Sequence, residues 1–363
     1  MHYSILGAGP AGLSSAIVLS NEGHKAVVYE SSPFLGGRSG NNIQAIRNYG
    51  TDKDIIKKIK SYGIEMPKLN PITRIIKYSP SHRFDEIYSN NEPIFYTFKR
   101  GPSPDSMENS LAEQAKSQGA KIILGKTAKV LDCQIIASGS KFDPVGFGYG
   151  ATFEGTFDKE TIAFFYGSDL IQNGYAYLTP YGNDQLSIAI TSFTKSDFNT
   201  ISERFEKFIK ADKIIQETIN GAKRLNTFAG YGHFNIPNSA VHKYKYFTGG
   251  AAGFVDPARG FGVKYAILSG AMAAKALIDR NTDYDELWKK EFAQELTDGF
   301  NRHLLLNKFT NKDYEKFVKE DKINIETYEK VPDTIKELFL KINGKAHLNN
   351  WKKKFDFKQL IDL

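Results

Sequence analysis

The sequence has little of several features that mark other classes of protein. It contains one cysteine, Cys133, in 363 residues, so no disulfide can form within the chain and a reducing compartment is favoured. No cysteines and histidines fall at metal-ligand spacing, so we predict no metal site. No run approaches the roughly 18 uncharged apolar residues of a membrane-spanning helix. With no signal-peptide pattern ahead of the first strand, we expect a cytoplasmic protein.

The composition is that of an ordinary globular protein. Hydrophobic residues make up 41% and charged residues 25% of the chain, and the length allows two connected domains, each with its own core. The net charge is +7, which is compatible with an acidic protein partner or an anionic lipid surface. The lysines are spread along the chain and no nucleic-acid motif is present, so we predict no nucleic-acid partner.

The most informative pattern opens the chain. The apolar run 4–6 leads into Gly7-Ala8-Gly9-Pro10-Ala11-Gly12, a G-x-G-x-x-G turn, and a helical pattern follows. Gly7 permits a tight turn, Gly9 lets a diphosphate approach the backbone, and Gly12 lets the helix pack closely on the strand. The amides at the start of such a helix attract phosphates. The turn therefore predicts a dinucleotide site, to which we assign Gly7, Gly9, Ala11 and Gly12.

A second strand and an acidic residue complete this unit. The strand 26–29 ends at Glu30, 18 residues beyond Gly12, where a ribose hydroxyl would need an acceptor. A glycine pair and a cation then follow in Gly36-Gly37-Arg38-Ser39. This loop suits a cofactor longer than NAD, with Arg38 facing its phosphates or its ring. We therefore predict FAD.

The remaining chain alternates between two kinds of pattern. Large apolar residues recur at every second position, at Ile162, Phe164 and Tyr166 and again at Leu186, Ile188 and Ile190. This period of two is typical of antiparallel strands with one buried face. We predict an α/β protein in which a Rossmann-type FAD-binding domain is interleaved with an antiparallel-sheet substrate domain and followed by a helical C-terminus. The predicted FAD-binding segments are 1–58, 93–140 and 240–280, the substrate domain covers 59–92 and 141–239, and the helical region covers 281–363.

Further glycines occur at the ends of predicted strands and helices later in the chain. Gly139 closes the strand 133–137, and Gly249-Gly250 precedes a second glycine pair, Gly260-Phe261-Gly262, that opens a helix at Val263. A helix N-terminus preceded by small residues is a second anion or carbonyl-oxygen site. The run 146–150 is also rich in glycine, but no helical pattern follows, so we interpret it as a strand junction and not as a phosphate loop.

Three segments resemble the geranylgeranyl reductase family, including its archaeal digeranylgeranylglycerophospholipid reductases, within the p-hydroxybenzoate-hydroxylase-like FAD proteins. They are GGAAGFVDPARGFGVKYAILSGAMAAKAL at 249–277, GYAYLTP at 174–180 and YDELWKKEF at 284–292. Lys99-Arg100-Gly101-Pro102 is similar to a family segment whose arginine contacts FAD. The likeness covers nearly the whole chain in order, and the second and third segments are the most specific.

The resemblance implies roles for individual residues. It implies FAD contacts for Gly12, Glu30, Arg100, Gly262 and Val263, with Arg38 and Ser39 beneath the flavin and with Gly139 and Gly250 beside it. It places Tyr175, Tyr177 and Pro180 on the wall of a long apolar tunnel. The family usually has aspartate where this chain has Gly250, and tryptophan and phenylalanine where it has Tyr177 and Thr179.

The implied activity is reduction of isoprenoid double bonds in a lipid by hydride from reduced flavin. No second dinucleotide domain is visible, so the electrons would come from a ferredoxin-like donor or a reduced carrier. Two alternatives remain: an FAD-dependent monooxygenase of an aromatic or apolar substrate, and a flavin-free lipid-binding protein. His233 is a weak candidate proton donor, because a lone histidine is more often structural. The cationic and aromatic segment 351–358 could rest on the inner face of the cell membrane.

Overall fold

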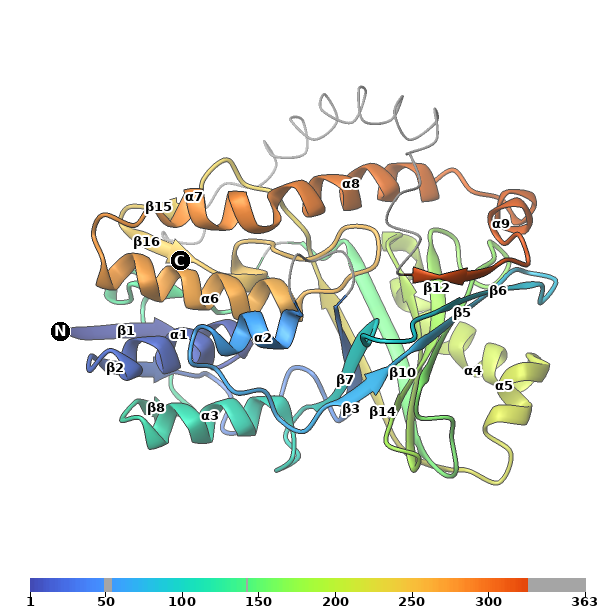
Figure 1. Cartoon of the computed structure of the whole chain (residues 1–363), viewed down its shortest axis with the longest axis horizontal. Coiled ribbons are helices and arrows are strands. Elements are labelled where there is room, and N and C mark those ends of the chain that lie inside the picture. The colour runs from blue at the N-terminus through green and yellow to red at the C-terminus, as the bar shows by residue number, and fades with distance from the viewer. Residues whose placement is uncertain (49–53, 142, 326–363) are drawn as a thin grey trace.

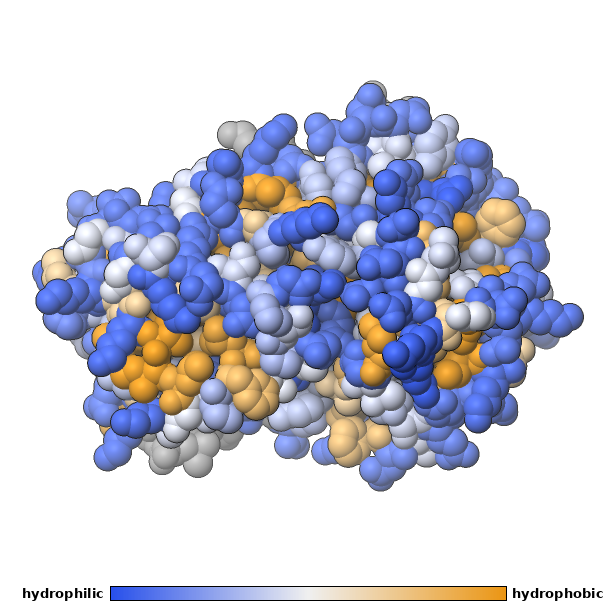
Figure 2. Space-filling view, turned by 90° about the horizontal axis from the view of Figure 1, so that it is seen from below, coloured by the Kyte–Doolittle hydropathy of each residue, from blue (hydrophilic) through white to orange (hydrophobic). Residues whose placement is uncertain are grey.

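The computed structural model describes residues 1–48, 54–141 and 143–325. Two layered regions lie side by side (Figure 1). Helix α8 (Gln294–Leu306) runs along the top of the view. No helix in the described ranges is long and apolar enough to cross a bilayer. Seen from below, the surface is mostly hydrophilic and its apolar residues gather in separate patches (Figure 2).

A six-stranded sheet forms the centre of the first region. Its strand order is β15-β16-β9-β1-β2-β8. All neighbouring strands are parallel except the pair β15–β16. The strands are β1 (His2–Leu6), β2 (Lys25–Tyr29), β8 (Lys121–Ile123), β9 (Ile135–Ile136), β15 (Val241–His242) and β16 (Lys245–Phe247). The carboxyl ends of β1, β2, β9 and β16 therefore meet at one edge, where open parallel sheets bind their ligands.

Helix α1 (Pro10–Asn21) packs on this sheet and contacts two further helices, α3 (Met107–Ser117) and α6 (Val263–Ile278). Helices α1 and α6 approach closely because Gly270 has no side chain, since a Cβ there would lie 2.1 Å from the Ala11 carbonyl oxygen. The Ser15 hydroxyl donates across the same contact to the Gly270 carbonyl at 2.8 Å. The N-terminus of α6 is thereby fixed beside the start of α1.

An eight-stranded sheet forms the second region, in the order β14-β10-β13-β12-β11-β5-β6-β17. Its strands are β5 (Arg74–Tyr78), β6 (Phe84–Tyr88), β10 (Gly146–Glu154), β11 (Thr161–Phe165), β12 (Gly174–Tyr181), β13 (Gln185–Ser192), β14 (Lys223–Gly232) and β17 (Lys322–Asn324). Helix α4 (Ile201–Ala211), followed by α5 (Lys213–Thr218), covers one face. Phe205 and Phe208 of α4 are buried there with Phe153 and Phe165. The opposite face of the sheet is left for the cavity described below.

A three-stranded sheet links the two regions. Strand β7 (Phe95–Arg100) pairs antiparallel with β3 (Asn42–Arg47) on one side and β4 (Asn70–Ile72) on the other. The alternating patterns did not distinguish this sheet, because its strands come from segments that we assigned to different domains. The exact domain boundaries stay a prediction.

Residues 281–325, the described part of the predicted C-terminal helical region, are helical with one exception. The helices of this region are α7 (Tyr284–Trp288), the π-helical turn 289–293, α8 and α9 (Asn311–Phe317). The short helix α2 (Ile55–Lys60) lies much earlier in the chain. Strand β17 was not expected: it pairs in parallel with β6 and completes the eight-stranded sheet. The segment 351–358 lies outside the described residues.

Candidate functional site

The glycine turn after β1 has the geometry that its sequence predicts. Gly7 has φ of +103°, and a Cβ there would lie 2.3 Å from the Ala137 carbonyl oxygen. A Cβ on Gly12 would lie 1.9 Å from the Gly7 carbonyl oxygen. A Cβ on Gly9 would meet no described atom within 4 Å. Packing therefore requires glycine at positions 7 and 12, whereas Gly9 faces open space beside the start of α1.

Glu30 lies at the end of β2, next to this turn. Its carboxylate accepts hydrogen bonds from the Ala8 amide at 2.8 Å and from the Ser32 amide at 2.9 Å. Gly9 caps α1 without a side-chain hydrogen bond from any described residue, so the amides of the first helical turn remain available for a ligand. A carboxylate and a helix N-terminus thus flank one open space, as a ribose and a diphosphate require.

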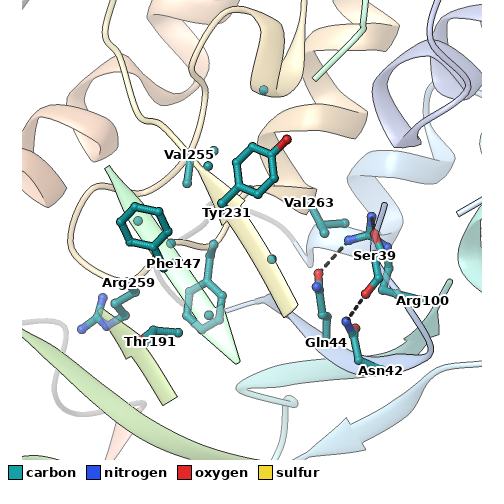
Figure 3. A pocket seen from close by; sticks show the side chains of 18 of the residues that line it. Ser39, Asn42, Gln44, Arg100, Phe147, Thr191, Tyr231, Val255, Arg259 and Val263 are labelled. Atoms are coloured by element: carbon teal, nitrogen blue, oxygen red, sulfur yellow. Dashed lines mark hydrogen bonds between the residues drawn. The ribbon is translucent and has the colours of Figure 1, made fainter. Parts of the chain in front are cut away.

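A cavity of about 410 Å³ begins at Pro10 and extends to the inner face of the eight-stranded sheet. Figure 3 shows Ser39, Asn42, Gln44 and Arg100 on one side of it, and Phe147, Thr191 and Arg259 on the other. Its volume lies within the usual range for small-molecule sites.

Most of the residues predicted for the site line this cavity: Arg38, Ser39, Arg100, Gly139, Tyr175, Tyr177, His233, Gly250, Gly262 and Val263. Gly7, Gly9, Ala11, Gly12 and Glu30 are not among the described lining residues and form the neighbouring turn. Pro180 is also not among the lining residues, and its carbonyl accepts a hydrogen bond from the Thr97 hydroxyl at 2.6 Å. Asn42, Gln44 and Tyr231 also line the cavity but were not predicted from the sequence, because these residues belong to no recognisable motif.

Arg100 is held firmly in the cavity wall. Its Nε donates to Glu108 at 2.6 Å, Nη1 to the Gln44 side chain at 2.6 Å, and Nη2 to the Ser39 hydroxyl at 3.0 Å. The Glu108 side chain is only 2% exposed. This ion pair fixes the end of β7 against α3 and brings Ser39 to the cavity.

Arg38 lies at the outer end of the cavity. Its guanidinium stands 4.7 Å from the centre of the Tyr231 ring, within the range of a cation–π contact. Gly139 has φ of +72°, and a Cβ on it would lie 2.3 Å from Nη1 of Arg38. Gly139 therefore leaves room for the cation that the sequence pattern predicted near the cofactor.

His233 is buried in the cavity wall, where Nδ1 is hydrogen-bonded to the Ser140 hydroxyl. Burial, reinforced by the positive charge of Arg38, lowers the pKa of His233 to about 4. The imidazole is therefore neutral at neutral pH and is not an imidazolium acid there. Its role as a proton donor stays a prediction.

The far end of the cavity is aromatic. The Tyr175 hydroxyl donates to the Arg259 carbonyl at 2.5 Å, and its ring centre lies 5.9 Å from that of Tyr177 and 5.7 Å from that of Phe164. Burial raises the pKa of both tyrosines, that of Tyr177 to about 12. These walls therefore present neutral rings to a ligand.

Glycines of strands β10 and β14 form part of one side of the cavity. Gly148 pairs with Gly230, and Gly146 pairs with Gly232, across strands β10 and β14. All four glycines line the cavity, and paired residues share a face of a sheet. The glycine run 146–150 thus lies in a strand, as expected, and makes room in the site.

The comparisons agree with this geometry. Residues 5–52 match the family model of an NAD(P)-binding Rossmann-like domain. A geranylgeranyl bacteriochlorophyll reductase-like protein from Thermoplasma acidophilum superposes over 99% of both chains with a TM-score of 0.70 and 16% identity. The flavin-dependent brominase Bmp2 matches 99% of this chain and 100% of its own, with a TM-score of 0.61 and 15% identity.

Curated relatives match only parts of the chain. A probable zeta-carotene desaturase of Synechococcus elongatus is 30% identical over 129 residues, which are 31% of this chain and 27% of the desaturase. The thiamine thiazole synthase of Pyrobaculum islandicum is 34% identical over 34% of this chain and 37% of its own length. The matches thus span only 27% and 37% of the lengths of these two relatives.

The chain has the fold of FAD-dependent oxidoreductases. The solved structures confirm the fold predicted from the resemblance to geranylgeranyl reductases. They include both a reductase-like protein and halogenases, so the fold alone leaves the substrate open.

Proposed function

We propose that the protein binds FAD and reduces isoprenoid double bonds of a lipid. One observation carries the proposal: the glycine turn of a dinucleotide site adjoins an aromatic, partly glycine-walled cavity of about 410 Å³. The flavin carries the redox chemistry in such enzymes, and the protein provides binding, alignment and exclusion of water.

The residues present fit FAD. The space beside Gly9 would take the diphosphate, Glu30 the adenosine ribose, and the cavity beside Arg38 the flavin end. A Cβ on Gly250 would lie 3.3 Å from the Ser140 amide nitrogen, so Ser140 is the polar group at the place where the family has aspartate. When bound and reduced, the flavin would supply hydride.

The aromatic end of the cavity would hold the lipid. An alkene reduced in this way must take up a proton as well as a hydride, and positive charge then develops on carbon. The faces of Tyr175 and Tyr177 can stabilise that charge. The raised pKa values keep both phenols neutral, and the bond from Tyr175 to the Arg259 carbonyl fixes its ring.

The electrons would come from an external donor, either an acidic ferredoxin-like protein or a reduced carrier. The net charge of +7 supports the acidic donor. Adding candidate donors one at a time to the oxidised protein, and recording the loss of flavin absorbance without oxygen, tests this choice.

The first test is the absorbance spectrum of the purified protein, followed by an anaerobic assay with dithionite and a geranylgeranyl lipid. We expect bound flavin, and product mass increasing by two hydrogens per reduced double bond. Oxygen-dependent consumption of NADPH with the alkene unchanged would support a monooxygenase instead. A colourless protein that takes up no FAD on titration would leave the lipid-binding alternative.

A matched pair of variants tests the cofactor assignment. Glu30→Ala should lose most of its flavin, because the adenosine ribose loses its acceptor. Glu113→Ala, which changes an exposed carboxylate on α3, should keep it. Equal flavin content in the two variants would refute the assignment of Glu30.

A further inference from the structure

The cavity reaches the surface beside the edge strand β14. Arg38, Ala229, Gly230 and Tyr231 both line the cavity and are exposed. Tyr231 and Phe147 lie near each other at the cavity in Figure 3. The mouth is therefore formed by the end of β14 and by the loop that carries Arg38.

Exposed aromatic side chains continue outward from this mouth. Tyr231 is 54% exposed and Phe198 is 56% exposed. The two are connected through Phe147, which pairs with Tyr231 across the β10–β14 ladder and whose ring centre lies 4.9 Å from that of Phe198. A hydrophobic surface thus extends the apolar cavity on this side.

The loop that carries Arg38 holds another exposed aromatic ring. Phe34 is 50% exposed, and its ring lies beside Gly37, where a Cβ would be 2.8 Å from it. The next residue, Arg38, stacks on Tyr231. We call Phe34, Arg38, Phe198 and Tyr231 the mouth rim.

Cations flank the mouth rim. Lys141 is exposed and follows Ser140, whose carbonyl accepts a hydrogen bond from Arg38. Lys195, 77% exposed, precedes Phe198 by three residues, and Asp143 lies 3.7 Å from it. Lys141 and Lys195 thus add exposed positive charge beside the mouth rim, with Asp143 next to Lys195. Exposed aromatic rings beside cations are typical of surfaces that bind anionic membranes.

We propose that the mouth rim docks on the anionic surface of a lipid bilayer. The inference depends on the proposed function for the reason to bind a membrane: docked there, the mouth would admit a lipid tail directly from the acyl chains into the cavity. The aromatic rings would enter the headgroup region while Lys141 and Lys195 meet lipid phosphates, and Arg38 would stay against Tyr231 beside the flavin end of the cavity. A two-fold dimer through this surface would oppose like charges, which argues against a second copy as the occupant.

The test is sedimentation with sucrose-loaded phosphatidylcholine vesicles, with and without about one third phosphatidylglycerol. The wild-type chain should bind the anionic vesicles. Phe198→Ser and Phe34→Ser should each lower its partition coefficient about fivefold, which corresponds to roughly 1 kcal/mol of interfacial contact. Lys195→Glu should lower binding to anionic vesicles by a similar factor. Phe84→Ser, an equally exposed phenylalanine (48%) on strand β6, is the control and should bind like the wild type.

Three results would overturn the proposal: no sedimentation of the wild-type chain, equal losses in Phe84→Ser and Phe198→Ser, or a dimer in light scattering that Phe198→Ser abolishes. Flavin content, measured on the same samples, separates this inference from the proposed function. Vesicle binding without flavin would refute the enzyme and keep the docking surface. Flavin-dependent reduction of detergent-dispersed lipid without vesicle binding would refute the docking surface and keep the proposed enzyme.

Discussion

The glycines of the first turn have separable roles. A side chain on Gly9 enters open space, whereas one on Gly12 collides with the Gly7 carbonyl oxygen. Gly9→Val should therefore keep its melting temperature and bind FAD at least about tenfold more weakly, because the side chain occupies the place of the diphosphate. Gly12→Ala should lose about 1–3 kcal/mol of stability. Thermal unfolding of the apoproteins and a flavin fluorescence titration measure the two effects, and a folding defect in Gly9→Val would contradict the assignment.

Arg100 gives a second prediction. Arg100→Met leaves the buried Glu108 carboxylate without its ion-pair partner, which should cost about 3–5 kcal/mol. Lys99→Met removes the neighbouring, more exposed pair with Asp105 and should cost less than about 1 kcal/mol. Melting temperatures compare the two variants. Arg100→Met/Glu108→Leu should recover much of the loss; a double variant no more stable than Arg100→Met would show that charge burial is not the cause.

Single residues were predictable from sequence only where a motif fixes their backbone. Gly7, Gly9 and Gly12 are set by a local turn, so spacing alone identified their positions. Gln44 and Tyr231 reach the cavity from strands that pair with distant segments, and no local pattern marks them. Pro180 was assigned through a motif, but it does not line the cavity, and its carbonyl accepts a hydrogen bond from the Thr97 hydroxyl of the neighbouring three-stranded sheet.

The ladder of β10 and β14 gives a prediction about ligand size. A Cβ on Gly230 would meet no described atom within 4 Å, so Gly230→Leu should fold and would fill part of the cavity. We expect about tenfold or more weaker lipid binding. Thr227→Leu, an exposed change on the same strand that lies outside the lining residues, is the control. Equal lipid affinity in the two variants would show that the glycine wall does not contact the substrate.

Strands were predictable where they alternate and contact neighbours in sequence. The alternation in 162–166 and 186–190 predicted strands β11 and β13, and helix α6 begins at Val263 as predicted. Strand β17 has three residues and forms only because β6 offers an unpaired edge. The sheet β3-β7-β4 also depends on long-range pairing, which periodicity does not reveal.

Two buried histidines predict how stability depends on pH. Burial lowers the pKa of His233 and His303 from 6.5 to about 4. The unfolded chain therefore binds protons that the folded chain does not, and stability is full above pH 6.5 and falls as the pH decreases toward 4. Each histidine should remove about 2 kcal/mol between pH 6.5 and 5.

Thermal unfolding from pH 7.5 to 5 measures this loss. Carboxylates with lowered pKa values, such as Asp54 and Asp158, keep their charge in this range and add little to it. His303→Gln removes one titrating ring, so its melting temperature should fall less with pH than that of the wild type. Parallel curves for the two proteins would show that His303 does not titrate as expected.

The pairing of β17 with β6 also constrains how the protein is made. Asp321 donates its amide to Asp85, 236 residues earlier in the chain. A growing chain on the ribosome thus has β6 ready long before its outer neighbour emerges from the exit tunnel. Until then this edge is open to pairing with other nascent chains, and a stop codon just ahead of Lys322 would leave it so permanently. We expect such shortened chains to need chaperones, even though both walls of the cavity would already be encoded.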